Sequence, residues 1–437
     1  MSVTWIGKPG GPLHGRVDVP GDKSVSHRAL MLAALAEGRS HVRGFLEGDD
    51  TRATARILQQ LGVRIDTPAP GQRVVHGVGL HGLRAPTGVL DCGNSGTGMR
   101  LLAGLLAGQA FNSELVGDAS LSRRPMRRVT EPLEAMGARI DTAADGCPPL
   151  RVRGGRSLAG ITCAPPMASA QVKSAILLAG LYADGDTVVN EVRPTRDYTE
   201  RMLAAFGWPV RFSPGRVHLA GGGRLRATEV DVPGDFSSAA FFVAAACVVP
   251  GSVLRVCGVG LHPRRAGLLE ALRLMGADVR TENAREVAGE TVADLVVRHA
   301  PLHGIEVPEV LVADMIDEFP ALFVVAATAD GVTTVRGAAE LRVKESDRIA
   351  SMATALRALG IRVDETPDGA RIHGGRLQGG TVDALGDHRL AMSLAVAGQV
   401  AAAPVHIRDC ANVATSFPGF RDLATGCGFV LEAASGA

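Results

Sequence analysis

An internal repeat constrains this chain more than any other feature. An apolar helical segment that ends in glycine and precedes a strand-like segment occurs six times in 437 residues. Glycine often ends helices, because it adopts a left-handed backbone conformation at little cost. Repeats of this length, each with strand patterns, exceed the usual solenoid period and predict six α/β repeats. The six glycines lie 68 to 84 residues apart, and the last copy matches least well: Gly62, Gly137, Gly207, Gly276, Gly360 and Gly428.

A longer period divides the chain into two halves. VPGDKS at residues 19–24 returns as VPGDFS at residues 232–237, and the stretches before the two copies are also alike. We therefore predict two domains of three repeats each, residues 22–234 and residues 1–21 plus 235–437. Each repeat should run strand, small-residue helix, strand, loop, amphipathic helix, strand.

Composition excludes several classes of function. A net charge of +1 and an aromatic content of 4% provide neither the basic field nor the stacking platforms of nucleic-acid binders. The seven cysteines show no paired spacing and no histidine cluster, so we expect reduced thiols and no metal site. The first residues lack an apolar signal core, and the most apolar run, residues 239–250, is too short to span a bilayer. We expect a cytoplasmic protein that binds neither nucleic acid nor membrane.

Basic residues cluster where six helices are expected to begin. A cation at that end opposes the helix dipole by ~0.3–1 kcal/mol. If the helix starts converge on a cleft, free amide donors and cations together make a strong anion site. Solvated loop charge explains any single cluster equally well, but the set of six favours the anion cleft. The clusters are Lys23 with Arg28, Arg123 to Arg128 around a proline expected to be the first helical residue (Pro125), Arg193 with Arg196, Arg264 with Arg265, Lys344 with Arg348, and His388 with Arg389.

Two motifs in the first half point to a ligand. PGDKSVSHR places Lys23, Ser24 and Arg28 at a capped helix start, whereas the second-half copy PGDFSSAAF retains the cap and lacks the cations. The scaffold therefore does not require those cations. CGNSGTGMR, residues 92–100, is a glycine-rich turn where the backbone can approach a ligand closely, but it is not a dinucleotide fingerprint.

Three further motifs carry candidate polar groups. MASAQVKSA offers the neutral donors Ser169 and Gln171 before a helix. ADMIDEFPA and RVKESDR offer carboxylates, Asp314 and Glu345, the latter between cations, and a carboxylate in that setting can serve in acid–base chemistry. GDHRLAM adds Arg389.

These motifs, with RRPM at residues 123–126, occur in the order seen in the enolpyruvylshikimate-phosphate synthases, which the chain resembles over nearly its whole length. The resemblance implies an inside-out α/β barrel fold with two domains, three βαβαββ repeats per domain and an active site in the cleft between them. It implies transfer of the carboxyvinyl group from phosphoenolpyruvate to the 5-hydroxyl of shikimate-3-phosphate through a tetrahedral intermediate, with release of phosphate, in the pathway to chorismate and aromatic amino acids. It implies no cofactor, and we expect a monomer.

The resemblance also assigns roles to residues. Asp314 takes the proton of the 5-hydroxyl with Lys344 as its partner, Glu345 protonates the methylene carbon, and Lys23 reaches both substrates. The herbicide glyphosate occupies the phosphoenolpyruvate pocket at Gly96, so we expect sensitivity to it. The remaining substrate contacts implied are Ser24, Arg28 and Arg196 for shikimate-3-phosphate, Gly96, Arg124, Arg348 and Arg389 for phosphoenolpyruvate, and Ser169 and Gln171 as further substrate ligands.

Two departures and two rivals qualify the resemblance. Ala170 and Thr415 stand where one branch of the family has Ser and Lys, which points to the other bacterial branch and leaves the last phosphate contact open. The UDP-N-acetylglucosamine enolpyruvyl transferases share the fold but usually have a catalytic cysteine in the loop that reads GDASLSRRPM here. A non-catalytic anion-binding relative would be expected to lack acid–base groups, whereas this chain retains Asp314, Lys344 and Glu345.

Overall fold

The computed structural model describes residues 3–287 and 289–434. The chain divides into Gly21–Val232, here called the inserted domain, and Met1–Pro20 with Pro233–Ala437, here called the split domain. Both crossings fall inside the repeated VPGD motif. A Cβ on Gly21 would lie 1.7 Å from the carbonyl oxygen of Gly44, so no larger residue fits where the chain enters the inserted domain.

The inserted domain contains three four-stranded sheets. In each, the first two strands run parallel and the remaining pairs antiparallel. The sheets, in strand order, are β14 (Glu229–Asp231), β3 (Glu37–Arg43), β5 (Gln72–Val78), β4 (Arg64–Asp66); β6 (Leu90–Asp91), β7 (Ser113–Val116), β9 (Leu150–Arg153), β8 (Arg139–Asp141); and β10 (Thr162–Cys163), β11 (Thr187–Asn190), β13 (Arg216–Leu219), β12 (Val210–Ser213).

The split domain repeats this plan with two variations. Its second sheet has three strands in the part of the chain that the structure describes, and its third sheet includes the N-terminal strand. The sheets, in strand order, are β16 (Asp278–Val287), β17 (Glu290–Arg298), β15 (Val253–Gly260), β2 (His14–Asp18); β18 (Val332–Val335), β20 (Gly369–His373), β19 (Val363–Thr366); and β21 (Gly380–Asp383), β22 (Val405–Arg408), β1 (Trp5–Lys8), β23 (Val430–Ala433).

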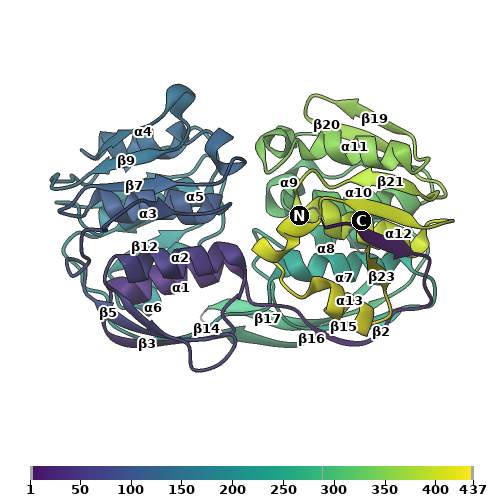
Figure 1. Cartoon of the computed structure of the whole chain (residues 1–437), viewed down its shortest axis with the longest axis horizontal. Helices are drawn as coiled ribbons and strands as arrows, with labels where there is room; N and C mark the ends of the chain where they lie inside the picture. The colour runs from purple at the N-terminus through teal and green to yellow at the C-terminus, as the bar shows by residue number, and fades with distance from the viewer. Residues whose placement is uncertain (1–2, 288, 435–437) are drawn as a thin grey trace. The chain divides into compact units, whose positions relative to one another are not determined.

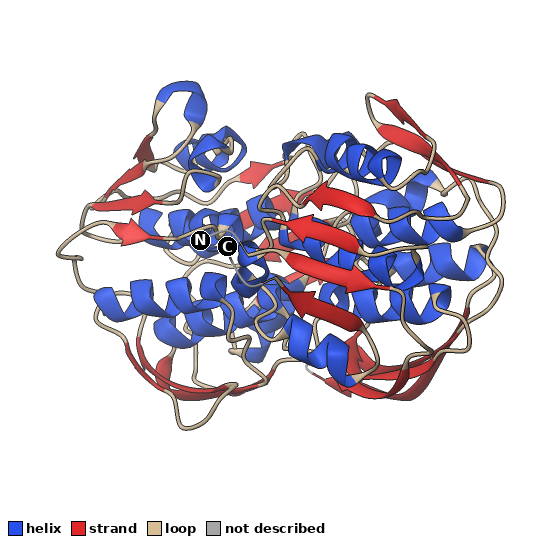
Figure 2. Cartoon of the chain, turned by 45° about the vertical axis from the view of Figure 1, so that its right-hand side comes forward, coloured by secondary structure: helices blue, strands red, loops and turns tan. Residues whose placement is uncertain are grey.

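The first helix of each repeat is buried along nearly its whole length, and the second buries one face. Within each domain the inner helices contact one another and the strands lie around them (Figure 1, Figure 2). The inner helices are α1 (Lys23–Leu35), α3 (Gly96–Ala107), α5 (Ala170–Gly180), α7 (Phe236–Val248), α10 (Phe319–Thr328) and α12 (His388–Val400). The outer helices are α2 (Asp49–Gln60), α4 (Arg127–Ala135), α6 (Tyr198–Ala205), α8 (Gly267–Leu274), α11 (Arg348–Ala358) and α13 (Phe420–Gly426), and the short α9 (Glu309–Val312) precedes α10.

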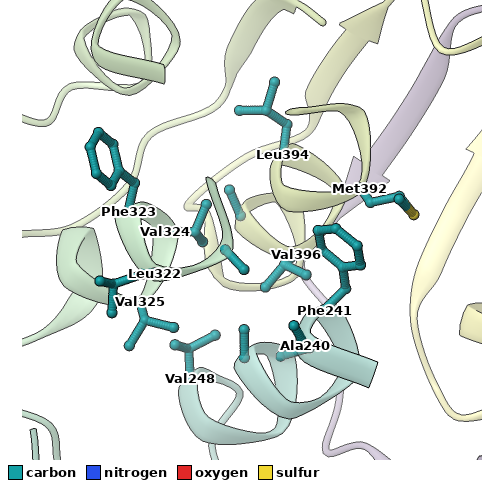
Figure 3. Close-up of a cluster of buried hydrophobic side chains, with 14 of the residues drawn as sticks. Ala240, Phe241, Val248, Leu322, Phe323, Val324, Val325, Met392, Leu394 and Val396 are labelled. Carbon is teal, nitrogen blue, oxygen red and sulfur yellow. The ribbon is translucent and has the colours of Figure 1, made fainter. Parts of the chain in front are cut away.

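The core of the split domain shows why the inner helices need no polar face. Side chains from α7, α10 and α12 point toward one another, including Phe241, Val325 and Val396 (Figure 3). A helix enclosed by other helices and by a sheet can be apolar all around, which explains the long apolar run at residues 239–250. Among the described residues, no helix is both long and apolar enough to cross a membrane. All seven cysteines are free thiols.

The glycines that defined the repeats end helices as predicted. All six have positive φ angles, from 82° to 113°. The sixth repeat takes one strand from the start of the chain: its sheet has β1 in the position that β13 occupies in the third sheet of the inserted domain. One expectation was wrong, since Pro125 precedes α4, which begins at Arg127, and the helix instead contains Pro132.

Candidate active site

The start of α1 presents Lys23 in a fixed setting. The Asp22 carboxylate accepts a hydrogen bond from the backbone N–H of Val25 and caps the helix. The Lys23 ammonium lies 2.9 Å from Asp50 Oδ2 at the start of α2, and its side chain is 18% exposed. The cation is therefore held by a carboxylate but still reachable by a ligand.

His27 links α1 to α2 and to the cap of α3. Its Nδ1 lies 2.8 Å from Thr54 Oγ1 on α2, and its Nε2 lies 3.3 Å from Ser95 Oγ, the residue that caps α3. Burial, with the nearby charges of Lys23 and Arg28, holds the pKa of His27 well below its ordinary value. The imidazole of His27 is therefore neutral and adds no charge next to Lys23 and Arg28.

The glycine-rich turn faces two guanidinium groups. A Cβ on Gly96 would lie 3.0 Å from Arg100 Nη1 and 3.1 Å from Arg124 Nη1. Arg124 donates to Asn94 Oδ1 at 2.9 Å, which holds it over the turn. The start of α3 and two cations thus lie together, so an anion there would meet positive charge from both. The N–H groups of Gly96 and Gly98 are bonded within the turn, to the Asn94 carbonyl oxygen and to Ser95 Oγ.

Gln171 links this turn to α5. Arg100 Nη1 donates to Gln171 Oε1 at 2.7 Å, and Gln171 Nε2 donates to Thr97 Oγ1 at 2.8 Å. Ser169 caps α5, because its hydroxyl accepts from the backbone N–H of Val172 at 3.4 Å.

Arg28 is buried and held by neutral partners. Its Nε donates to Thr199 Oγ1 and its Nη2 to Ser174 Oγ, both at 2.7 Å, and its Nη1 donates to the carbonyl oxygen of Ser24 at 2.9 Å. Burial and the charge of Arg196 lower the pKa of Arg28 to about 10. An anion placed beside both cations would relieve their repulsion.

In the split domain, Arg348 is the centre of an ion-pair network. Its side chain is 1% exposed and forms a fork with Asp387, the α12 cap, at 2.8 and 3.3 Å. Its Nη2 also donates to Glu345 Oε2 at 2.6 Å. Burial alone would lower the pKa of Arg348, but Asp387 and Glu345 raise it above its ordinary value. Glu345 is thus fixed in place at the start of α11.

Asp317 connects the other cations of this domain. Its carboxylate lies 3.6 Å from both Lys344 Nζ and Arg348 Nη1, and its carbonyl oxygen accepts from Arg389 Nη1 at 3.0 Å. Asp314 lies in a short 3-10 turn, Ala313–Met315, with Oδ2 3.3 Å from Arg264 Nη1. The RVKESDR, GDHR and ADMIDEFP motifs therefore meet around Asp317.

The sequence-predicted residues form two sets, one in each domain. Lys23, Ser24, Arg28, Gly96, Arg124, Ser169, Gln171 and Arg196 lie in the inserted domain, and Asp314, Lys344, Glu345, Arg348 and Arg389 in the split domain. Sequence reasoning did not single out Arg100, Asn94 or Asp50, although the first two stand inside the glycine-rich motif. Over residues 3–287 and 289–434, no group of three or more His, Cys, Asp or Glu side chains is placed to hold a metal ion.

Comparisons with known proteins agree on one family. A family model described as EPSP synthase (3-phosphoshikimate 1-carboxyvinyltransferase) matches residues 8–423. A 3-phosphoshikimate 1-carboxyvinyltransferase of Xanthomonas campestris pv. campestris (strain B100) is 66% identical over 429 residues, 98% of each chain. An EPSP synthase structure from Acinetobacter baumannii superposes with a TM-score of 0.89 at 49% identity, over 99% of this chain and 100% of the other. The enolpyruvyl transferase NikO from Streptomyces tendae, at 20% identity and a TM-score of 0.81 over 100% of this chain and 99% of the other, shares the fold.

Proposed function

The chain belongs to the family of EPSP synthases, the 3-phosphoshikimate 1-carboxyvinyltransferases, and from this premise we propose how its residues carry out the transfer. The protein is a carboxyvinyl transferase with the inside-out α/β fold of that family. The family assignment favours shikimate-3-phosphate over UDP-N-acetylglucosamine as the acceptor.

The pair of guanidinium groups at Gly96 is the observation that carries our site proposal. Arg100 and Arg124 lie beside Gly96, which has no side chain and is the first residue of α3. Phosphoenolpyruvate is small and carries several negative charges, so it suits a site with close backbone approach and two cations. Lys23 adds a third cation, and we propose that Arg348 and Arg389 of the split domain contact the same substrate.

The acceptor, shikimate-3-phosphate, is bound by other polar residues of the inserted domain. Arg28 and Arg196 provide charge for the phosphate of shikimate-3-phosphate, and Ser24, Ser169 and Gln171 provide neutral hydrogen bonds for the remaining polar groups. Neutralising two anionic substrates by fixed cations is the main electrostatic task of such an enzyme, because the substrates otherwise repel one another.

The proposed reaction has two steps. In the addition, the 5-hydroxyl oxygen bonds to the central carbon of the enol, Asp314 takes the hydroxyl proton beside Lys344, and Glu345 gives a proton to the methylene carbon. In the elimination, the C–O bond to phosphate breaks and phosphate leaves with the electron pair, the new methyl group returns a proton to Glu345, and the vinyl double bond forms again. The proton that Asp314 took from the hydroxyl ends on the released phosphate, so both carboxyl groups return to their starting states. We propose that both domains contribute to this one site and that the protein acts as a monomer in the cytoplasm.

Phosphate release with each acceptor tests the function. With phosphoenolpyruvate present, shikimate-3-phosphate should support release and UDP-N-acetylglucosamine should not. The opposite pattern, or no release with either acceptor, contradicts the proposal. A static light-scattering mass of 45.3 kDa tests the monomer.

Gly96→Ala tests the phosphoenolpyruvate pocket. The added methyl would meet Arg100 and Arg124 at 3.0 and 3.1 Å, and an extra methyl in a packed site typically costs ~1–3 kcal/mol. We expect strongly weakened inhibition by glyphosate and a higher KM for phosphoenolpyruvate, with less change for shikimate-3-phosphate. A wild-type enzyme that already resists glyphosate, or an unchanged inhibition constant in the variant, would show that Gly96 does not line the pocket.

Asp314→Asn and Glu345→Gln test the proton transfers. Loss of a positioned proton-transfer group should lower kcat by about 10²- to 10⁴-fold. Glu306→Gln, at an exposed ion pair with Arg336, is the matched control and should leave kcat unchanged. Near-normal turnover of either site variant, measured by phosphate release, contradicts that residue's assignment.

A further inference from the structure

A buried lysine of the inserted domain has no role in the reaction as described so far. Lys173 lies on α5 with a side chain that is 3% exposed. Its ammonium lies 2.9 Å from Glu191 Oε2 and 2.7 Å from Glu200 Oε1, and both carboxylates are also buried. A buried charge is costly unless it is paired, so this three-residue cluster is a built feature of the domain.

The two carboxylates stand at opposite ends of one loop. Glu191 directly follows β11, and Glu200 lies in the first turn of α6, so residues 191–197 form the connection between them. Inside the loop, the Thr195 hydroxyl donates to Glu191 Oε1, and the Thr195 N–H donates to Glu191 Oε2 at 3.4 Å. Lys173 therefore fastens both ends of the loop, and Thr195 fastens its middle to the same carboxylate. The next residue is Arg196.

The same contact between α5 and α6 also holds Arg28. Ser174 and Thr199 are the chain neighbours of Lys173 and Glu200, and their hydroxyls lie 2.7 Å apart. Both hydroxyls accept hydrogen bonds from Arg28 at 2.7 Å. Two adjacent sets of interactions thus join α5 to α6. One is the ion pair of Lys173 with Glu200, and the other is the pair of hydroxyls, Ser174 and Thr199, that bind Arg28.

Arg196 lies in the loop that Lys173 anchors, and Arg28 is held by the neighbouring hydroxyls of Ser174 and Thr199. We therefore propose that Lys173 is a positioning residue for the two arginines that bind the phosphate of shikimate-3-phosphate. Lys173 acts by holding loop 191–197 in one conformation, which keeps Arg196 close to Arg28. The inference rests on the phosphate-binding role proposed for these two arginines. It predicts that loosening the loop weakens binding of the acceptor and leaves binding of phosphoenolpyruvate unaffected, because the Gly96 turn has its own supports in Asn94 and Ser95.

Two conservative variants loosen the loop and leave Lys173 paired with Glu200. Thr195→Val removes a hydroxyl without changing any charge, and Glu191→Gln removes the carboxylate that anchors the loop. We expect each to raise KM for shikimate-3-phosphate by about tenfold, with kcat and KM for phosphoenolpyruvate within about twofold of wild type. Asp186→Asn is the control, since this exposed carboxylate pairs with His218 beside the same strand, and its kinetic constants should not change.

Lys173→Met is the direct test, and it is paired with a charge-balanced variant in case the single substitution unfolds the domain. Lys173→Met combined with Glu191→Gln and Glu200→Gln removes all three charges, and we expect its KM for shikimate-3-phosphate to stay high. A return to the wild-type KM would show that only charge balance matters and would overturn the positioning role. Equal changes in both KM values, or no change in the loop variants, would overturn it too.

Arg196→Gln separates this inference from its premise. A raised KM for shikimate-3-phosphate in Arg196→Gln, with unchanged constants in Thr195→Val and Glu191→Gln, would reject the role of Lys173 alone. An unchanged KM in Arg196→Gln would reject the phosphate-binding role of Arg196, and the inference with it.

Discussion

Helices α1 and α7 begin with the same motif but use it differently. Both are capped by the aspartate of VPGD, Asp22 in α1 and Asp235 in α7. In α1 the next residue is Lys23, which remains partly exposed. In α7 the next residue is the buried Phe236. The cation near this cap is Arg265, which precedes α8, and its Nη2 lies 2.8 Å from Asp235 Oδ1 and 2.9 Å from Ser237 Oγ.

This difference distinguishes Lys23, for which we propose contact with the substrates, from Arg265, which is a structural cation. Arg265 is 5% exposed and fills the cap of α7, while Ser237 in turn donates to the buried Glu318, whose pKa is raised by burial. Lys23 makes its ion pair with Asp50 and remains 18% exposed, and the Asp22 carboxylate accepts from the backbone N–H of Val25. The same motif can therefore start a helix with a buried arginine at the cap or with a partly exposed lysine beside it.

Replacing Lys23 or Arg265 by a neutral side chain should give the largest effects. The first replacement should lower activity, and the second should lower stability. We expect Lys23→Met, combined with Asp50→Asn so that no buried carboxylate loses its partner, to lower kcat/KM by about 10²- to 10³-fold, as for loss of a group that stabilises charge in the transition state, with a small change in unfolding free energy. We expect Arg265→Met to lower the unfolding free energy by about 3–5 kcal/mol, because it leaves buried Asp235 without that ion pair. Phosphate-release kinetics and urea unfolding of both variants provide the measurements. Similar profiles for the two variants would refute the distinction.

Removing the caps should give a smaller effect with a defined order. Asp22→Ala should cost about 0.5–2 kcal/mol, the usual value for a helix N-cap. Asp235→Ala should cost more, because it also leaves the buried Arg265 without this partner. Urea unfolding would show the order, and an equal loss in both variants would mean that Arg265 adds nothing to the cap of α7.

His27 should give the smallest effect, visible only through pH. The folded pKa of His27 lies below its unfolded value of about 6.5. The unfolded chain therefore binds more protons between the two values, and stability falls as pH drops below about 6.5. His27→Gln, which cannot titrate, should flatten the decline of Tm between pH 7 and pH 5, as scanning calorimetry can show. An equally steep decline in the variant would assign the acid sensitivity to other groups.

The sequence predicted what depends on local chemistry. Glycine stops, the capped starts of the two VPGD helices and the alternation of strands with a small-residue and an amphipathic helix follow from short-range preferences. The second strand after the amphipathic helix was implied only by the family resemblance. Arg265 at the α7 cap was not predicted, because PGDFSSAAF contains no cation and the arginine lies beyond α7 and β15 in the chain. The fork between Arg348 and Asp387 was missed for the same reason: their approach is set by the packing of α11 and α12. The first strand of the fifth repeat is reduced to isolated bridges at His303 and Glu306, which no local pattern indicates.

The position of β1 determines the order in which the protein can fold during its synthesis. Residues 5–8 leave the ribosome first, yet their partners are β22 and β23, which are made last. The inserted domain has all its strands once residue 231 has emerged. At ordinary synthesis rates, β1 then waits on the order of ten seconds or more for both of its neighbours. The inserted domain can therefore fold before the split domain, whose last sheet needs both ends of the chain. A stop before residue 430 would remove β23 and leave one edge of β1 unpaired, although the inserted domain would have all its strands.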